Sequence, residues 1–151
     1  MMKKTNEEQI AVRPLRVEEI EWIEPPQHHS AYSKLLVNPD NSATSYFDFR
    51  ISLYQPKGYV EAHVHQRAEH VYYVLQGRGL MKLDDRQYVV EAHMAIFIPP
   101  GVVHALANTG LENLLFIVVT APAGELPMSD NWASAQEVRP SSGQNERETH
   151  T

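Results

Sequence analysis

The stretch GYVEAHVHQRAEHVYYVLQG, residues 58–77, carries three of the chain's eight histidines between two glycines. Side chains alternate between the two faces of a β-strand, so His63 and His65 point the same way and Val64 points the other way. They lie about 6.5 Å apart along a strand, and two such imidazoles can tilt onto one ion at about 2 Å. The polar turn that follows brings His70 back on the next strand. The stretch predicts two strands with a metal-binding face.

A fourth histidine follows a turn of proline and glycine. The sequence PPGVVH, residues 99–104, predicts a tight turn that opens a strand at His104. Ligands from three strands of a small barrel can meet in its interior. We therefore expect one divalent transition metal, because imidazole suits Fe, Zn, Ni and Cu. The expected ligands are His63, His65, His70 and His104, and Glu69 is the alternative to His70 if the strand register differs by one residue.

Short β-rich runs with turn residues between them fill the middle of the chain. No long amphipathic helix separates them, which indicates an all-β sandwich or barrel. The expected strands are Thr44–Gln55, Tyr59–Val64, Val71–Leu75, Gly79–Leu83, Gln87–Val90, Ala95–Ile98, His104–Ala107 and Leu114–Thr120.

Composition excludes several classes of protein. A chain of 151 residues is most economically one domain, and its formal charge of −6 with scattered Lys and Arg argues against nucleic-acid binding. The chain has no cysteine, so disulfides, thiolate metal sites and cysteine nucleophiles are excluded. The longest apolar run, residues 114–119, is too short to span a membrane. No secretory signal is recognisable at the start, and we expect a cytoplasmic protein.

Three regions follow from these patterns. Residues 1–43 form an N-terminal arm with potential strands, residues 44–122 form the barrel, and residues 123–151 form a polar tail that we expect to be mobile. The arm has more apolar residues than a small barrel can cover, so we expect a homodimer with contacts through the arm. These apolar residues are Trp22, Ile23, Leu35, Leu36 and Val37.

The expected lining of the barrel follows from the strand that begins at Phe47. Its apolar set, Phe47, Phe49, Ile51 and Leu53, is the expected core face. The other set contains Arg50, which we expect to be solvated. If Arg50 pointed inward, it would indicate a substrate with a carboxylate. His28 and His29 are expected to be solvated in a loop after two prolines, and His93 is expected in a turn or on the surface.

With these motifs, residues 44–122 resemble the cupin superfamily of small jelly-roll barrels. The first family motif is matched from Gly58 through the HxH pair to Gly77, with His70 at the position of the family's glutamate. The second motif is matched from Pro99 to Asn108, with His93 in place of its opening glycine. Fifteen residues separate the two motifs, as in compact bacterial cupins.

This resemblance implies a single jelly-roll β-barrel with an all-histidine metal site, and it adds manganese to the candidate metals. It favours a metal-dependent enzyme, an oxidoreductase of dioxygenase type acting on a small organic molecule, with Tyr72 as a proton donor. The alternatives are an oxygen-independent isomerase, cyclase or lyase that uses the metal as a Lewis acid, and a non-catalytic barrel that binds a small ligand. No nucleic acid or membrane partner is expected.

Overall fold

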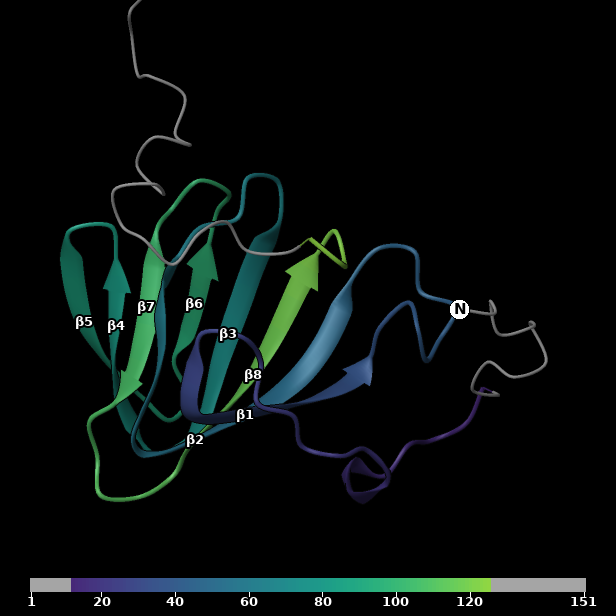
Figure 1. Ribbon diagram of the computed structural model, residues 1–151, viewed down its shortest axis with the longest axis horizontal. Coiled ribbons are helices and arrows are strands. Elements are labelled where there is room, and N and C mark those ends of the chain that lie inside the picture. The colour runs from purple at the N-terminus through teal and green to yellow at the C-terminus, as the bar shows by residue number, and fades with distance from the viewer. Residues whose placement is uncertain (1–11, 126–151) are drawn as a thin grey trace, which may run out of the picture.

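The computed structural model describes residues 12–125, whose regular secondary structure is almost all β-strand (Figure 1). One 3-10 turn, η2 (Val17–Glu19), precedes them. No helix in this part of the chain is long and apolar enough to cross a membrane. The strands are β1 (His28–Val37), β2 (Asp48–His63), β3 (Glu69–Gln76), β4 (Arg78–Leu83), β5 (Arg86–Glu91), β6 (Ala95–Ile98), β7 (His104–Asn108) and β8 (Leu114–Ala121).

The strands form one antiparallel sheet that curls around a common interior (Figure 1). Its order is β5-β4-β7-β2-β8-β3-β6, and β1 pairs with β2 outside this path. The long strand β2 belongs to both halves of the sheet, because residues 48–54 pair with β8 and residues 59–63 pair with β7. The predicted all-β jelly-roll fold is confirmed.

Strand β2 continues through a position where the sequence predicts a turn between two strands. Pro56-Lys57-Gly58 was expected to separate two strands, but β2 is continuous for 16 residues and only bends there. Lys57 has a φ of 69°. A Cβ on Gly58 would lie 2.3 Å from the carbonyl oxygen of Ser30, so glycine allows β1 to pass close to the bend. Pairing on both sides of the bend supplies the hydrogen bonds that hold the strand together.

The interior face of β2 is the polar set, not the apolar set that we expected. Asp48, Ser52 and Tyr54 are only 6%, 3% and 2% exposed. The apolar residues 49, 51 and 53 lie on the opposite face, in register with residues 119, 117 and 115 of β8. Strand β8 is apolar on both faces, so its pattern does not show which face of β2 turns inward. The expectation of an apolar core face here is therefore wrong.

The apolar core fills the interior next to the histidines, with Tyr72 in contact with both. Tyr54 packs edge-on against Phe116, and Phe116 stacks on Tyr72 with ring centroids 5.4 Å apart. The buried cluster consists of Ala31, Tyr54, Val60, Tyr72, Val74, Met81, Val90, Ile98, Leu106, Leu114, Phe116 and Val118. This cluster is the apolar core of the protein within the described residues.

Strand β1 comes from the N-terminal arm and pairs with β2 of the same chain. It begins at His28, so the expected loop at His28 and His29 is wrong, because both residues pair in register with β2. His29 is exposed, as expected, and its ring stacks on Tyr59 with centroids 4.7 Å apart, whereas His28 is half-buried. Residues 1–11 and, but for its first three residues, the predicted polar tail 123–151 lie outside the described residues.

Candidate metal centre

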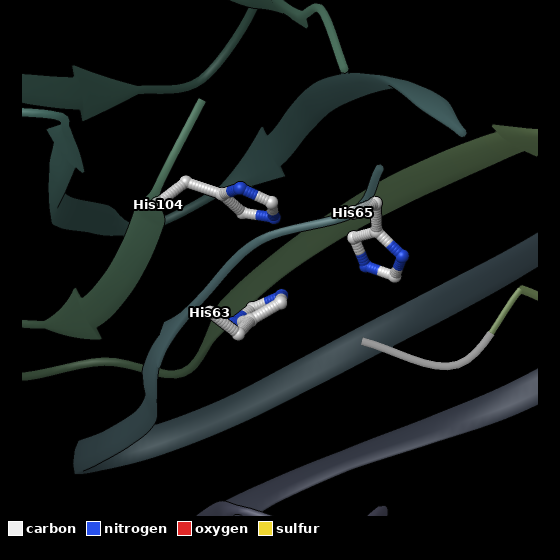
Figure 2. A group of neighbouring side chains, drawn as sticks. All are labelled: His63, His65 and His104. Carbon is white, nitrogen blue, oxygen red and sulfur yellow. The ribbon is translucent and has the colours of Figure 1, made fainter. Parts of the chain in front are cut away.

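Three histidine side chains meet inside the barrel, where β2 and β7 come together. His63 ends β2 and pairs in register with His104, which begins β7. His65 follows two residues after β2. One ring nitrogen from each of the three lies within 4.8 Å of the others (Figure 2). The side chains are nearly enclosed, since His63 and His65 are each 7% exposed and His104 is 2% exposed.

His70 of β3 lies against this group. It is 6% exposed, and its ring centroid lies 4.5 Å from that of His65 and 5.4 Å from that of His104. Its nitrogens are outside the tightest group of three. Glu69 precedes it on the strand, so it faces the other side of the sheet and is exposed. The structure brings His70, and not Glu69, to the other histidines.

Hydrogen bonds orient three of the four rings. His63 Nδ1 donates to the carbonyl oxygen of Glu61 at 2.7 Å, and His104 Nδ1 donates to that of Val102 at 2.9 Å. His70 Nδ1 bonds the hydroxyl of Thr120 at 2.8 Å. A carbonyl only accepts, so it places the proton on Nδ1 and leaves the lone pair on Nε2 of His63 and His104. Such outer hydrogen bonds typically hold histidine ligands of metals.

Three ring nitrogens at this centre lack a protein partner. His65 Nδ1, His70 Nε2 and His104 Nε2 are buried and form no hydrogen bond with any residue of the described range 12–125. An unsatisfied buried polar atom costs about 1–3 kcal/mol. A cation bound at these nitrogens would remove that cost. The donor set therefore fits a divalent transition metal that favours imidazole.

All four rings are neutral near pH 7. Burial is the largest cause, and it lowers the pKa of His63 to about 3 and that of His104 to about 4. Burial and neighbouring histidines lower the pKa of His65 to about 4 and that of His70 to about 2. Neutral imidazole is the form that binds a metal.

The loops that carry the ligands are tied together by backbone hydrogen bonds. The amide of Gly101, whose φ is 81°, donates to the carbonyl of His65 at 2.8 Å and so joins the two histidine motifs. The carboxylate of Glu125 accepts from the amides of Gln66, Arg67 and Ala68 at 2.5–3.1 Å. These contacts fix the chain on both sides of His65.

Other side chains complete the surroundings of the site. Tyr72 is buried with its ring 6.0 Å from that of His70, and burial raises its pKa to about 12. Asp48, Arg50 and Thr120 also lie on interior positions, and the sequence reasoning did not place them there. His28 packs against Tyr54. The alternation of β2 was the available signal for Arg50, but it fitted either face.

Asn108 and His93, which belong to the second histidine motif, have structural roles in turns. Asn108 donates through its side-chain amide to the carbonyls of Tyr54 and Glu112, both at 2.8 Å, and so holds the turn before β8. His93 lies exposed in the turn between β5 and β6 with a φ of 69°, as the sequence indicated. Glycine adopts that conformation most easily, which explains the glycine of the family motif.

Comparison with known proteins agrees with this geometry. The family model described as a cupin domain matches residues 50–120, which span β2 to β8 and include all four histidines. Residues 50–120 therefore form a cupin domain, and the predicted resemblance to the cupin superfamily is confirmed. Among solved structures, this cupin resembles the cupin-2 domain Rru_A2000 from Rhodospirillum rubrum with a TM-score of 0.68 at 17% identity, covering 83% of this chain and 84% of that one.

Two curated relatives and a second structure extend the comparison. This cupin is 38% identical to MJ1618 of Methanocaldococcus jannaschii over 60 residues, 40% of this chain and 48% of the relative, so the match spans about half of that protein. It is 27% identical to the polyketide synthase CurC of Streptomyces cyaneus over 77% of this chain and 75% of CurC. The polyketide cyclase RemF from Streptomyces resistomycificus has a TM-score of 0.65 at 24% identity, covering 79% and 88% of the two chains.

Proposed function

We propose that this cupin is a metal-dependent enzyme that acts on a carbonyl group of a small organic molecule by Lewis-acid chemistry. The observation that carries the proposal is a cluster of buried, neutral histidines. One ring nitrogen each of His63, His65 and His104 lies within 4.8 Å of the others. Buried ring nitrogens of His65, His70 and His104 have no hydrogen-bond partner among residues 12–125. His63, His65 and His104 would hold the ion, with His70 as the fourth donor. A divalent ion held there supplies a positive charge that polarises a substrate oxygen or lowers the pKa of a bound water.

The chain's own residues prepare the site for this chemistry. Carbonyl and hydroxyl partners hold the rings before anything binds, and the buried apolar cluster with Tyr54 and Phe116 supplies an apolar surrounding on the side of Tyr72. Tyr72 holds its proton at neutral pH because burial raises its pKa to about 12. We assign it as the proton donor to a substrate oxygen that gains negative charge.

The oxygen-independent reaction is better supported than the dioxygenase that the sequence favoured. The non-haem iron pattern for O₂ chemistry combines two histidines with a carboxylate. Glu69 was the candidate for that carboxylate, and it is exposed on the other face of β3. The similarity to CurC, a polyketide synthase by name, is compatible with a substrate rich in carbonyl groups. An isomerase, cyclase or lyase reaction is therefore our first candidate.

The first test measures metal. We expect purified wild-type protein to contain about one transition metal ion per chain by elemental analysis, and the His63→Ala/His104→Ala variant to contain almost none. His93→Ala is the matched control, because His93 lies exposed in a turn and should leave the metal content unchanged. Equal metal in all three proteins would contradict the site.

The second test separates the reactions with acetylacetone, a small 1,3-diketone. In anaerobic buffer the Lewis-acid proposal predicts an enolate absorption band that the metal-free protein lacks. Oxygen uptake with loss of the diketone in air would instead support the dioxygenase. A metal-loaded protein that shows neither would leave the non-catalytic ligand-binding barrel as the better description.

A further inference from the structure

An ion pair lies on the interior face of β2, close to the histidines. Asp48 is opposite Thr120 in the sheet register, and Thr120 is opposite His70 and bonds its ring. Arg50 occupies the next interior position. It lies opposite Val118, which lies opposite Tyr72. The backbones of β2 and β3 are thus two strand spacings apart, about 10 Å, and their interior side chains face one shared space.

The ion pair leaves one edge of the guanidinium open. Nε and Nη2 of Arg50 donate to the same oxygen, Oδ1 of Asp48, at 3.3 and 3.0 Å. The edge formed by Nη1 and the second N–H of Nη2 donates no hydrogen bond to another residue within the described range 12–125. That edge is the planar fork that binds a carboxylate through two parallel hydrogen bonds.

The exposure of the pair fits a binding role. The Asp48 side chain is 8% exposed, whereas the Arg50 side chain is 27% exposed, so the carboxylate is enclosed and the guanidinium reaches accessible space. Neutralising Asp48 requires only the Nε–Nη2 edge of Arg50, so the open edge is left over for a ligand. The expectation that Arg50 is a solvated surface arginine is therefore wrong, because its strand turns the polar face inward.

The sheet register directs Arg50 toward the same interior as the site. Val118 separates Arg50 from Tyr72, just as Thr120 separates Asp48 from His70. An anion bound at the open edge of Arg50 would therefore share this interior with His70 and Tyr72.

We propose that Arg50, positioned by Asp48, is an anion-binding subsite that selects substrates with a carboxylate a few atoms from the reacting carbonyl. The inference rests on the proposed function for the metal end of the substrate. It adds a second point of attachment, which fixes the orientation of the carbonyl at the metal. The substrate class is an oxo acid or a diketone with a carboxylate tail.

Succinylacetone is a suitable probe, because it joins a 1,3-diketone to a short carboxylate tail, and its methyl ester is the neutral control. We expect cobalt-loaded wild-type protein to bind the acid about tenfold more tightly than the ester, as one charge-assisted pair predicts. The cobalt absorption spectrum reports diketone binding in both titrations. The measured quantity is the ratio of the two dissociation constants.

Variants assign this ratio to Arg50. We expect Arg50→Gln to bring the ratio close to one by weakening the acid about tenfold, with the ester unchanged. Arg86→Gln, a substitution at the exposed first residue of β5, is the matched control and should keep the wild-type ratio. If Arg50→Gln does not fold because Asp48 loses its partner, the neutral Asp48→Asn/Arg50→Gln pair replaces it.

Each outcome bears on one proposal. Two outcomes would overturn the subsite and leave the proposed metal site intact. The first is a wild-type ratio near one with a normal change in the cobalt spectrum. The second is a preference for the acid that persists in Arg50→Gln. If the wild type binds no metal, the proposed function fails, and chelator-treated protein decides the subsite. The Nε–Hε NMR signal of Arg50 is identified as the one that is missing from the spectrum of Arg50→Gln. In the chelator-treated protein this signal should shift when the acid is added and should not shift when the ester is added. No shift with the acid would overturn the inference.

Discussion

At the scale of single residues, the proton positions at the site depend on atoms outside it. The carbonyls of Glu61 and Val102 leave the free lone pairs of His63 and His104 on Nε2. Neither carbonyl can be removed by changing a side chain. Thr120 differs, because its contact with His70 is made by a side-chain hydroxyl. It therefore offers a direct test of how orientation affects metal binding.

Thr120→Val removes this hydroxyl and nearly preserves the side-chain volume. We expect metal affinity to fall about tenfold, the lower end of the range for losing such a partner, since the His70 ring is no longer held. Competition with a chromophoric chelator measures the affinity. Thr109→Val, in the exposed turn before β8, is the control. Equal affinities in all three proteins would contradict the role of the Thr120 hydroxyl in positioning His70 for metal binding.

At the scale of elements, the segment after β8 supports the loop that carries His65. Glu125 accepts hydrogen bonds from three consecutive amides, and these bonds together lower the pKa of its carboxyl against the opposing effect of burial. Three amides that point at one carboxylate form an anion-binding concavity. The loop thus depends on a residue 57 positions after Ala68.

Glu125→Ala should loosen this loop without changing the sheet. We expect faster hydrogen exchange at the amides of residues 66–68, because they lose a charged acceptor, together with weaker metal binding. Exchange measured by NMR or mass spectrometry checks the first effect. Glu18→Ala in η2 is the control, since Glu18 is exposed and far along the chain. Unchanged protection at all three amides would show that the clamp does not form in solution.

At the scale of the whole molecule, the four buried histidines make stability depend on pH. Their pKa values in the folded protein, about 2 to 4, lie below the ordinary value of 6.5. Below that value the unfolded chain binds more protons than the folded chain, so acid favours unfolding. The stability of the metal-free protein should be complete above about pH 6.5 and fall at lower pH, by at most about 1.4 kcal/mol per pH unit for each histidine.

Urea unfolding of metal-free protein at about pH 8 and about pH 5 measures this effect. We expect a clearly lower midpoint at the acidic pH. Replacement of His70 by Asn should reduce the difference between the two midpoints, whereas His93→Asn, in an exposed turn, should not. Midpoints that agree at the two pH values would contradict the burial of neutral rings.

The outer face of the sheet bears on assembly. Val71, Tyr73 and Phe97 are 42%, 39% and 56% exposed there. Their neighbours across the strands on this face are also apolar, namely Val119 and Ile117 of β8 and Phe49 and Ile51 of β2. Lys34 of β1 is paired with Ile51, so it lies on the same outer face of the sheet. The ammonium group of Lys34 lies over the ring of Trp22, which places this residue of the arm beside the face. A second copy of the chain is the occupant that we propose, because a symmetric dimer covers such a face on both copies at once.

Light scattering should give about twice the chain mass of 17.2 kDa. Phe97→Lys places a charge at the β6 end of the exposed apolar rows and should shift the protein toward the monomer. Val89→Lys, 57% exposed on β5, is the control and should keep the dimer. A wild-type mass near that of one chain would contradict the proposal.

The sequence alone determined the parts of this protein that rest on local chemistry. Alternation in the HxH pair placed His63 and His65 on one side of the chain, the proline–glycine turn placed His104 at a strand start, and the turn residues marked most strand ends. These features depend on neighbouring residues and on standard strand geometry, so they can be read without knowing the partners.

The tertiary structure decided the features that depend on register between distant strands. Pairing of β2 with β8 turned Asp48 and Arg50 inward, although the apolar set of the same strand favoured the opposite face. Pairing of β3 with β8 gave Thr120 to His70 and left Glu69 outside. A one-residue shift reverses every face of a strand, and β8, apolar on both faces, gave no local signal to choose between the registers.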